Sequence, residues 1–258
     1  MPIIIPSQHT APVFYPDSDY VVVKYMDLTK FISLLFRKSL FFCRLDKLED
    51  PFEGTTAKQN YDLRKQWHEA GRPYLHEPIT DEELLEQVKV MYDHDNQMKA
   101  LVCINCWNKC ENESAALWKI YADFNKGIMI KSSIQNLHAA FANNGKQVAL
   151  SEIRYMDYRK ETMLDGNSNY LIIHKQKAYS YEEEVRLIYS VIPEIGWVYN
   201  WEEEEVQEGK YIDIDLNLLI DEIVISPFAP AWFFKLVEDI MYKYELSKPI
   251  NKSELSLA

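Results

Sequence analysis

Glycine is scarce in this chain, and its scarcity narrows the range of nucleotide-binding folds. Only 7 glycines occur among 258 residues. The sequence contains neither GxGxxG nor GxxxxGK[ST], the glycine-rich loops that bring backbone amides close to a phosphate. It also lacks the GxSxG turn of serine hydrolases and the HExxH motif of zinc proteases. The common dinucleotide, P-loop, hydrolase and metalloprotease classes are therefore disfavoured.

Long apolar segments and excess positive charge are also missing. No stretch reaches the roughly 18 apolar residues that a membrane-spanning helix needs. The N-terminal sequence MPIIIPSQHT lacks the basic segment of a secretory signal. The net charge is −12, whereas proteins that follow duplex DNA along its phosphates usually present a basic surface. These features predict a cytoplasmic protein without membrane association and without extended binding to duplex DNA.

Cysteines are few, and their spacing does not form a metal site. Three of the four, Cys103, Cys106 and Cys110, lie close together, and the fourth is Cys43. A structural zinc site usually needs a second pair of ligands at a suitable distance, which C-x2-C-x3-C alone does not supply. We therefore predict free thiols and no metal bound by the cysteines.

The remaining composition, with 47% hydrophobic residues, is that of an ordinary globular protein. Periodicity predicts strands at 20–24, 40–44, 101–107, 127–131, 147–155, 183–191, 210–214 and 222–226. It predicts helices at 28–37, 57–70, 81–93, 114–122, 133–142, 170–178 and 231–244. Because this order lacks the strict alternation of parallel sheets, we predict an α+β fold with a mostly antiparallel sheet core and inserted helices. The domain would span 19–246, after an extended proline-rich arm (1–18) and before a polar, frayed C-terminal tail (247–258).

Three segments carry side chains suited to chemistry, and the first is RLDKLEDPFEG, residues 44–54. Pro51 restricts the loop, and Asp50 and Glu53 lie on either side of it. One interpretation is a turn in which Asp50 accepts hydrogen bonds from backbone amides. The other is the wall of a cleft in which Arg44 holds an anionic ligand.

The second segment, residues 116–127, has the sequence ALWKIYADFNKG. Trp118 and Tyr121 are three residues apart and so share one side of a predicted helix. Both belong to the core in one interpretation. In the other, they form an aromatic surface for a planar ring such as a base or nicotinamide.

The third segment, residues 175–186, has the sequence KQKAYSYEEEVR. Alternation along a strand would place Glu182, Glu184 and Arg186 on one face. Three charges on one face are costly to bury without partners, so this face must meet either water or a polar cleft. A solvated edge strand is one interpretation. A cleft is the other, with Arg186 balancing one carboxylate and leaving the second available.

Together these segments resemble the bacterial family called domain of unknown function 2971. Its pattern is an aromatic–Lys–Tyr opening, an fNDPfE loop, W-x-x-Y-a-d-x-h-x-G and W-x-y-E-x-E-x-R. The matching stretches here are Val23–Tyr25, Glu49–Glu53, Trp118–Gly127 and Tyr179–Arg186, and the resemblance covers residues 20–226. Three positions depart from the pattern, with Glu49 in place of Asn, Asn125 in place of His and Tyr179 in place of Trp.

The layout of these motifs is similar to that of ADP-ribosyltransferases, which use NAD. This resemblance implies that Arg44 holds the phosphates or a ribose of NAD and that Trp118, Tyr121 or Tyr181 stacks on the nicotinamide. It further implies that Glu184 or Glu182 contacts the ribose 2′-hydroxyl and stabilises the positive charge that grows as nicotinamide leaves. The partner would be a nucleotide-like small molecule, and the acceptor is left open.

Two other functions fit the same residues. In a metal-dependent nuclease or phosphoesterase, Asp50, Glu53, Glu182 and Glu184 would bind Mg²⁺, with Lys175 or Lys177 near the phosphate. In a non-enzymatic binding or regulatory protein, with a role in bacterial conflict or phage defence, the charged residues would form an ion-pair network and the aromatic residues would be packing.

Overall fold

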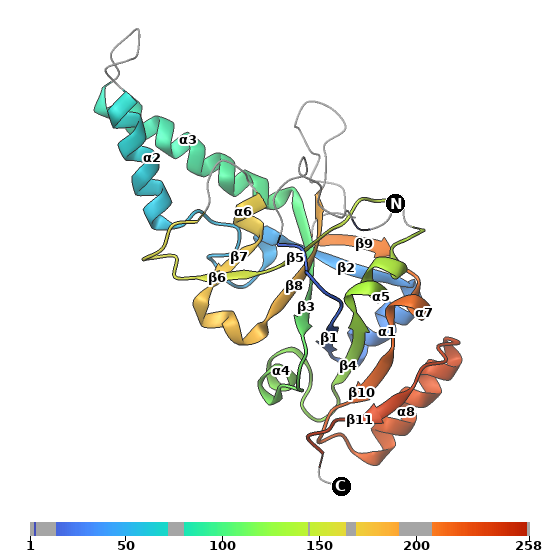
Figure 1. Ribbon diagram of the computed structural model, residues 1–258. Helices are drawn as coiled ribbons and strands as arrows, with labels where there is room; N and C mark the ends of the chain where they lie inside the picture. Colours follow the sequence, from blue (N-terminus) through green and yellow to red (C-terminus); the bar gives the residue numbers. More distant parts are fainter. Residues whose placement is uncertain are drawn as a thin grey trace.

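The computed structural model describes residues 3, 14–71, 80–143, 145–163, 169–190 and 208–256. Most of the predicted N-terminal arm lies outside this part of the chain. The described residues form one large, mostly antiparallel sheet with helices on both sides, so the prediction of an α+β fold is confirmed (Figure 1). None of the described helices combines the length and apolar character needed to cross a bilayer.

Nine strands build the main sheet. They are β1 (Val21–Met26), β2 (Ser39–Arg44), β3 (Val102–Lys109), β4 (Ile128–Ser133), β5 (Ala149–Glu152), β8 (Glu184–Ser190), β9 (Gly209–Asp213), β10 (Glu222–Ile225) and β11 (Ile250–Lys252). A separate parallel pair consists of β6 (Arg154–Met156) and β7 (His174–Gln176). The helices are α1 (Leu28–Arg37), α2 (Lys58–Gly71), α3 (Asp81–Ala100), α4 (Ala115–Tyr121), α5 (Ile134–Ala140), α6 (Asn169–Ile172), α7 (Leu216–Leu219) and α8 (Ala231–Lys243).

Strand β3 is the branch point of the sheet. One of its edges pairs with β8 along almost its whole length, and β1 and β2 share its other edge. β8 in turn lies between β3 and β5, so it is an interior strand and the interpretation as a solvated edge strand is wrong. Glu184 and Arg186 on this strand are 3% and 0% exposed, so their charges must find partners within the protein.

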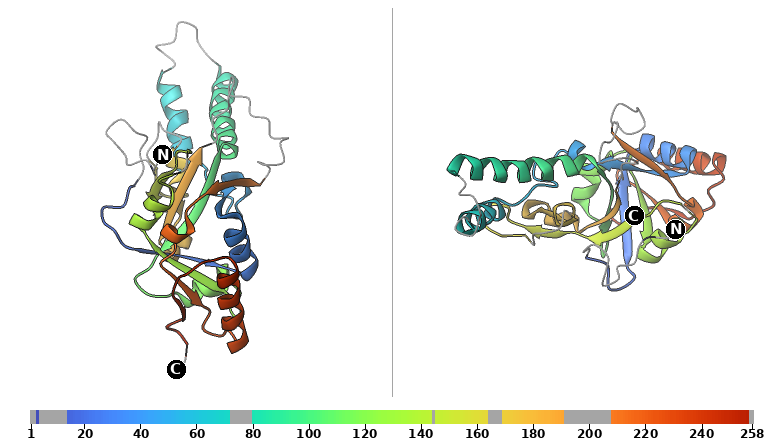
Figure 2. Two further views of the ribbon diagram at one scale, coloured as in Figure 1. Left: turned by 90° about the vertical axis from the view of Figure 1, so that its right-hand side faces the viewer. Right: turned by 90° about the horizontal axis from the view of Figure 1, so that it is seen from above.

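Different helices and strands cover the two faces of the sheet. On one face, side chains such as Phe42, Trp107 and Leu187 join the largest apolar core, packed under residues of α1, α5, α7 and α8. These helices lie on one side of the sheet in Figure 1, whereas α4, α6 and the β6–β7 pair lie on the other side, and the α2–α3 hairpin projects outward (Figures 1 and 2). Successive residues of a strand point to opposite faces, so Glu184 and Arg186 lie on the face opposite Leu187. That second face carries the candidate functional site.

Local signals in the sequence predict several elements correctly. Helix α1 spans the predicted residues, begins after the N-cap Asp27, whose carboxylate accepts a hydrogen bond from the Lys30 amide, and buries Phe31, Leu34 and Leu35. The prediction of one helix over 170–178 is wrong. Only α6 is α-helical there, and β7 and a 3-10 helix, Lys177–Glu182, follow it.

The C-terminal tail also differs from its prediction. Residues predicted to be frayed form β11, which pairs in parallel with β10. The Glu113 carboxylate accepts hydrogen bonds from the Ser253 hydroxyl and from the Glu254 amide at 2.9 Å. These partners come from distant parts of the chain, which is why a polar local sequence does not reveal them.

Candidate functional site

Five charged side chains meet on the second face of the sheet and form what we call the charge cluster. Its members are Glu53, Lys175, Glu182, Glu184 and Arg186, and all five are buried. Two segments far apart in the sequence supply them. One is the loop after β2, and the other is the continuous stretch of β7, the 3-10 helix that follows it and the start of β8. Tertiary structure therefore brings the first and third predicted segments together.

Arg186 lies at the centre of the cluster and is 0% exposed. Its Nη2 donates to both carboxylate oxygens of Glu53 at 2.8 Å, and its Nε donates to Glu184 Oε1 at 2.6 Å. Its Nη1 donates to the carbonyl oxygen of Ile172 at 2.6 Å. A guanidinium presents its donors in a fixed plane, so these contacts fix both carboxylates relative to the sheet.

Lys175 is a member that the predicted site residues omitted. Its ammonium Nζ lies 2.6 Å from Glu182 Oε2, 3.0 Å from Glu184 Oε2 and 3.2 Å from Glu53 Oε1. Lys175 reaches this position because β7 pairs with β6 at Tyr155↔Lys175. No local sequence pattern predicts that pairing, and the sequence analysis assigned Lys175 a role only in the nuclease alternative, as a phosphate contact.

The cluster holds three carboxylates against two cations, so it carries a surplus negative charge when all are ionised. Burial by itself would raise the pKa of Glu184, but Arg186 and Lys175 lower it well below its usual range. At Glu182 burial outweighs the neighbouring Lys175 ammonium, and the pKa is raised. The neighbouring cations therefore favour the ionised form of Glu184, whereas burial disfavours the ionised form of Glu182.

Three tyrosines surround Glu182 and Lys175, and we call them the tyrosine rim. The Tyr121 hydroxyl donates to Glu182 Oε1, and burial together with this carboxylate raises the pKa of Tyr121. The Tyr179 ring centroid lies 4.9 Å from Lys175 Nζ and 6.5 Å from that of Tyr181. Tyr121 and Tyr181 are 39% and 46% exposed, so the rim joins the buried charges to the surface.

Asp50 adds a further carboxylate beside the rim. Its Oδ1 accepts a hydrogen bond from the Phe52 amide at 2.9 Å, so the prediction of a turn held by Asp50 is confirmed. Its Oδ2 is buried and has no hydrogen-bond partner among the described residues. The negative charge of Asp50 is the main cause that raises the pKa of Tyr179, which places this carboxylate next to the rim.

Arg44 does not join this group, contrary to the prediction that it holds a ligand in the same cleft. Arg44 pairs with Cys103 across β2 and β3, whereas Arg186 pairs with Cys106 across β8 and β3. Cys103 and Cys106 are three residues apart on one strand and point to opposite faces, so the two arginines do as well. The Arg44 guanidinium instead pairs with Asp46 at 2.6 Å.

Trp118 is also placed differently from Tyr121. Its indole is 0% exposed and meets the Tyr25 ring edge-on, with the centroids 5.0 Å apart. Its Nε1 donates to Glu113 at 3.0 Å. The interpretation of Trp118 as a core residue is therefore confirmed, and the stacking surface predicted for it is wrong, because a fully buried ring offers no face to a ligand.

The metal-dependent alternative fits these contacts poorly. The ammonium and guanidinium groups of Lys175 and Arg186 lie between the carboxylates, where a cation would have to bind. No group of three or more His, Cys, Asp or Glu side chains in the described part of the chain is arranged to hold a metal ion. All four cysteines are free thiols, as predicted.

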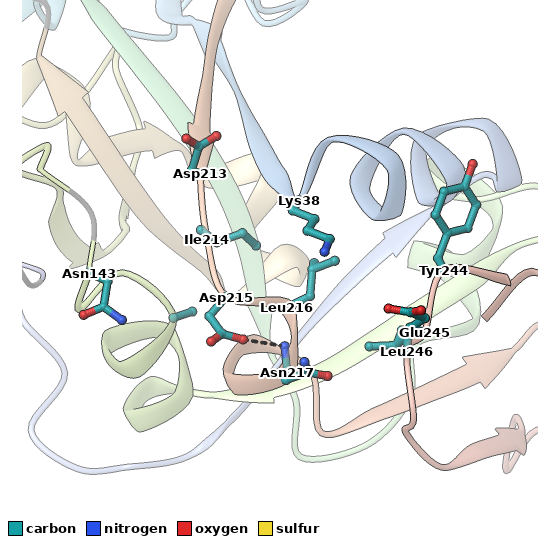
Figure 3. A pocket seen from close by; sticks show the side chains of 11 residues that line it. Lys38, Asn143, Asp213, Ile214, Asp215, Leu216, Asn217, Tyr244, Glu245 and Leu246 are labelled. Atoms are coloured by element: carbon teal, nitrogen blue, oxygen red, sulfur yellow. Dashed lines mark hydrogen bonds between the residues drawn. The ribbon is translucent and has the colours of Figure 1, made fainter. Parts of the chain in front are cut away.

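A pocket of about 460 Å³ lies elsewhere on the molecule and contains none of the predicted site residues. Figure 3 shows that its polar side chains include Lys38, Asp213 and Asp215. The Asp215 carboxylate accepts hydrogen bonds from the amides of Asn217 and Leu218 and so caps α7. We therefore attribute a structural role to Asp215 and place the candidate site at the charge cluster.

The chain matches no protein-family model. It matches no curated protein. Among solved structures, it is similar to DarT from Thermus sp. 2.9 in complex with NAD+, with 11% identity, coverage of 93% of this chain and 98% of DarT, and a TM-score of 0.40. For the complex of that protein with carba-NAD+, the identity is 11%, the coverage 93% and 97%, and the TM-score 0.36. Likeness at this level carries no argument, so we interpret the site from its own geometry.

Proposed function

We propose that this chain binds a nucleotide-like small molecule and is an NAD-using, ADP-ribosyltransferase-like enzyme in which Glu182 is the working carboxylate. The observation that carries the proposal is the buried cluster of three carboxylates and two cations, in which Glu182 is bordered by the tyrosine rim. NAD presents a matching group, because its nicotinamide ring is flat and positively charged.

The chemistry of NAD cleavage would benefit from such a site. When the bond between ribose C1′ and the nicotinamide nitrogen breaks, its electron pair leaves with nicotinamide and positive charge grows on the ribose. A preorganised anion in a buried site stabilises that charge far better than water does. Glu182 would contact the ribose, and Tyr121, Tyr179 or Tyr181 would offer a ring face to nicotinamide. The acceptor nucleophile, or water, would then bond to C1′.

The geometry favours Glu182 over Glu184 for this task. Both carboxylates are buried and have both oxygens hydrogen-bonded, but those of Glu184 accept only from the buried cations Arg186 and Lys175. Glu182 instead adjoins the half-exposed ring of Tyr121. We assign Glu184, Arg186 and Glu53 to positioning, because they act through Lys175 rather than through a ligand. The resemblance to the domain of unknown function 2971 belongs to this proposal, since its motif residues Glu53, Glu184 and Arg186 are among those that meet.

The test is release of nicotinamide from NAD by the purified full chain, with and without a cell extract as a source of acceptors. Glu182→Gln keeps the shape and removes the charge, so we expect the rate to fall by about a hundredfold or more. The matched control is Glu183→Gln, which changes the adjacent, exposed carboxylate and should leave the rate unchanged. Equal rates for Glu182→Gln and the parent would refute the assignment of the working carboxylate.

One observation favours the non-enzymatic alternative. The oxygens of Glu53, Glu182 and Glu184 already have hydrogen-bond partners inside the protein, as in a purely structural network. In that case NAD would neither be cleaved nor raise the melting temperature, although a ligand of the folded state should do so. Substituting Glu182 would then lower stability alone. A single melting series with NAD on the parent and on Glu182→Gln separates the two functions.

A further inference from the structure

A cavity of about 430 Å³ borders the loop that carries Asp50 and Glu53. This volume falls within the range of about 300–1,000 Å³ that is usual for small-molecule sites. The loop, the α2–α3 hairpin and the segment after β6 all contribute to its wall. The side chains that matter for the argument are Phe52, Lys58, Tyr61, Tyr92, Tyr158 and Arg159.

Aromatic rings form two parts of this wall. The ring centroids of Phe52 and Tyr158 are 5.7 Å apart, and those of Tyr61 and Tyr92 are 6.0 Å apart. The first pair joins the loop to the segment after β6, and the second joins α2 to α3. The accessible rings of Phe52, Tyr61 and Tyr92 offer flat, polarisable surfaces to a bound planar group, and such stacking is a general source of affinity for bases.

The charge of the wall is positive. Lys58 and Arg159 line the cavity, both are exposed, and neither forms an ion pair within the described part of the chain. No acidic side chain belongs to the lining. In a protein with a net charge of −12, two unpaired cations beside one aromatic cavity form a local site for an anion. This is the reverse of the charge cluster, where negative charge is in excess.

We propose that this cavity is a second binding site, for a planar aromatic group that carries a phosphate, such as a nucleoside monophosphate. The rings of Tyr61, Tyr92 and Phe52 would hold the planar group, and Arg159 and Lys58 would bind the phosphate. The proposal does not depend on the proposed function, because none of these residues belongs to the charge cluster.

The test uses AMP as the probe, titrated into the full chain by calorimetry, with adenosine and inorganic phosphate as separate arms. We expect saturable binding of AMP that is tighter than that of either part. Arg159→Ala should weaken it by about tenfold or more, since it removes a charge-assisted contact. The matched control is Lys160→Ala, which removes a neighbouring exposed cation outside the lining and should leave the affinity unchanged.

Repeating the AMP titration at saturating NAD shows whether the cavity binds part of NAD or a separate nucleotide. Loss of AMP binding would assign the cavity to the adenosine half of the dinucleotide, and retained binding would assign it to a separate nucleotide. Both results support the site. Binding should persist in Glu182→Gln, so failure of the proposed function leaves this test intact. The proposal is wrong if millimolar AMP shows no saturable binding, if phosphate alone binds as tightly, or if Arg159→Ala and Lys160→Ala bind AMP equally.

Discussion

Replacing Arg186 by Met tests the charge cluster more directly than any other single change. Methionine occupies a similar space without charge, so the substitution leaves no large cavity. It does remove the guanidinium that donates to Glu53 and Glu184, which are both 3% exposed. Lys175 would then be the only cation within the cluster facing three buried carboxylates.

The expected cost follows from the burial of these groups. Removing one partner of a buried ion pair typically destabilises a protein by about 3–5 kcal/mol, since it leaves a charge without compensation. For a chain of this size, each kcal/mol lowers the melting temperature by roughly 2–4 °C. We therefore expect Arg186→Met to lower it by roughly 6–20 °C.

The assay is urea unfolding followed by circular dichroism, with the melting temperature as a second measure. The control Lys160→Met removes a cation whose side chain is 81% exposed, and we expect a change of about 0–1 kcal/mol or less. Adding Glu184→Met to Arg186→Met removes the stranded carboxylate and should restore part of the lost stability. If Arg186→Met costs no more than the control, or if the two cluster substitutions act additively, the reasoning about mutual compensation is refuted.

Two further predictions concern Glu184 inside the charge cluster and Arg44 outside it. Because the folded-state pKa of Glu184 is lowered, this group stabilises the fold at pH values above its unfolded pKa of about 4.3, and that stability is lost as the pH falls through the folded-state pKa. Urea unfolding at decreasing pH from pH 6 should show a fall in the free energy of unfolding that is smaller in Glu184→Gln. Equal pH dependence in the parent and the variant would contradict the prediction. Arg44 lies on the opposite face of the sheet and pairs with Asp46. Arg44→Ala should therefore leave the rate of nicotinamide release within about twofold of the parent rate. A loss as large as that expected for Glu182→Gln would show that Arg44 belongs to the site.

The sequence determined those features whose causes are local. The N-cap Asp27 and the apolar stripe of Phe31, Leu34 and Leu35 specify α1 because a helix brings residues three and four apart onto one side. Asp50 and Pro51 specify the turn because a carboxylate next to a restricted backbone reaches amides only two residues away.

Alternation along β8 correctly placed Glu184 and Arg186 on one face and Leu187 on the other, but it wrongly included Glu182, which lies at the end of the 3-10 helix before the strand. The same pattern identified them as residues needing partners, but it did not identify the partners. Glu53 and Lys175 come from elements whose meeting depends on the β6–β7 pairing and on the loop after β2. No period within a single segment contains that information.

Tertiary structure alone decided whether predicted site residues from different elements share a face. Arg44 was expected beside Glu184, but the register of β2 against β3 turns it to the other face, and a shift of one residue would have reversed that outcome. Trp118 and Tyr121 share one short helix, yet β1 buries the first against Tyr25 and the 3-10 helix brings Glu182 to the second. The physical reason is that a side chain's periodicity is set by its own backbone, whereas its partners are set by strand pairing and packing between distant segments.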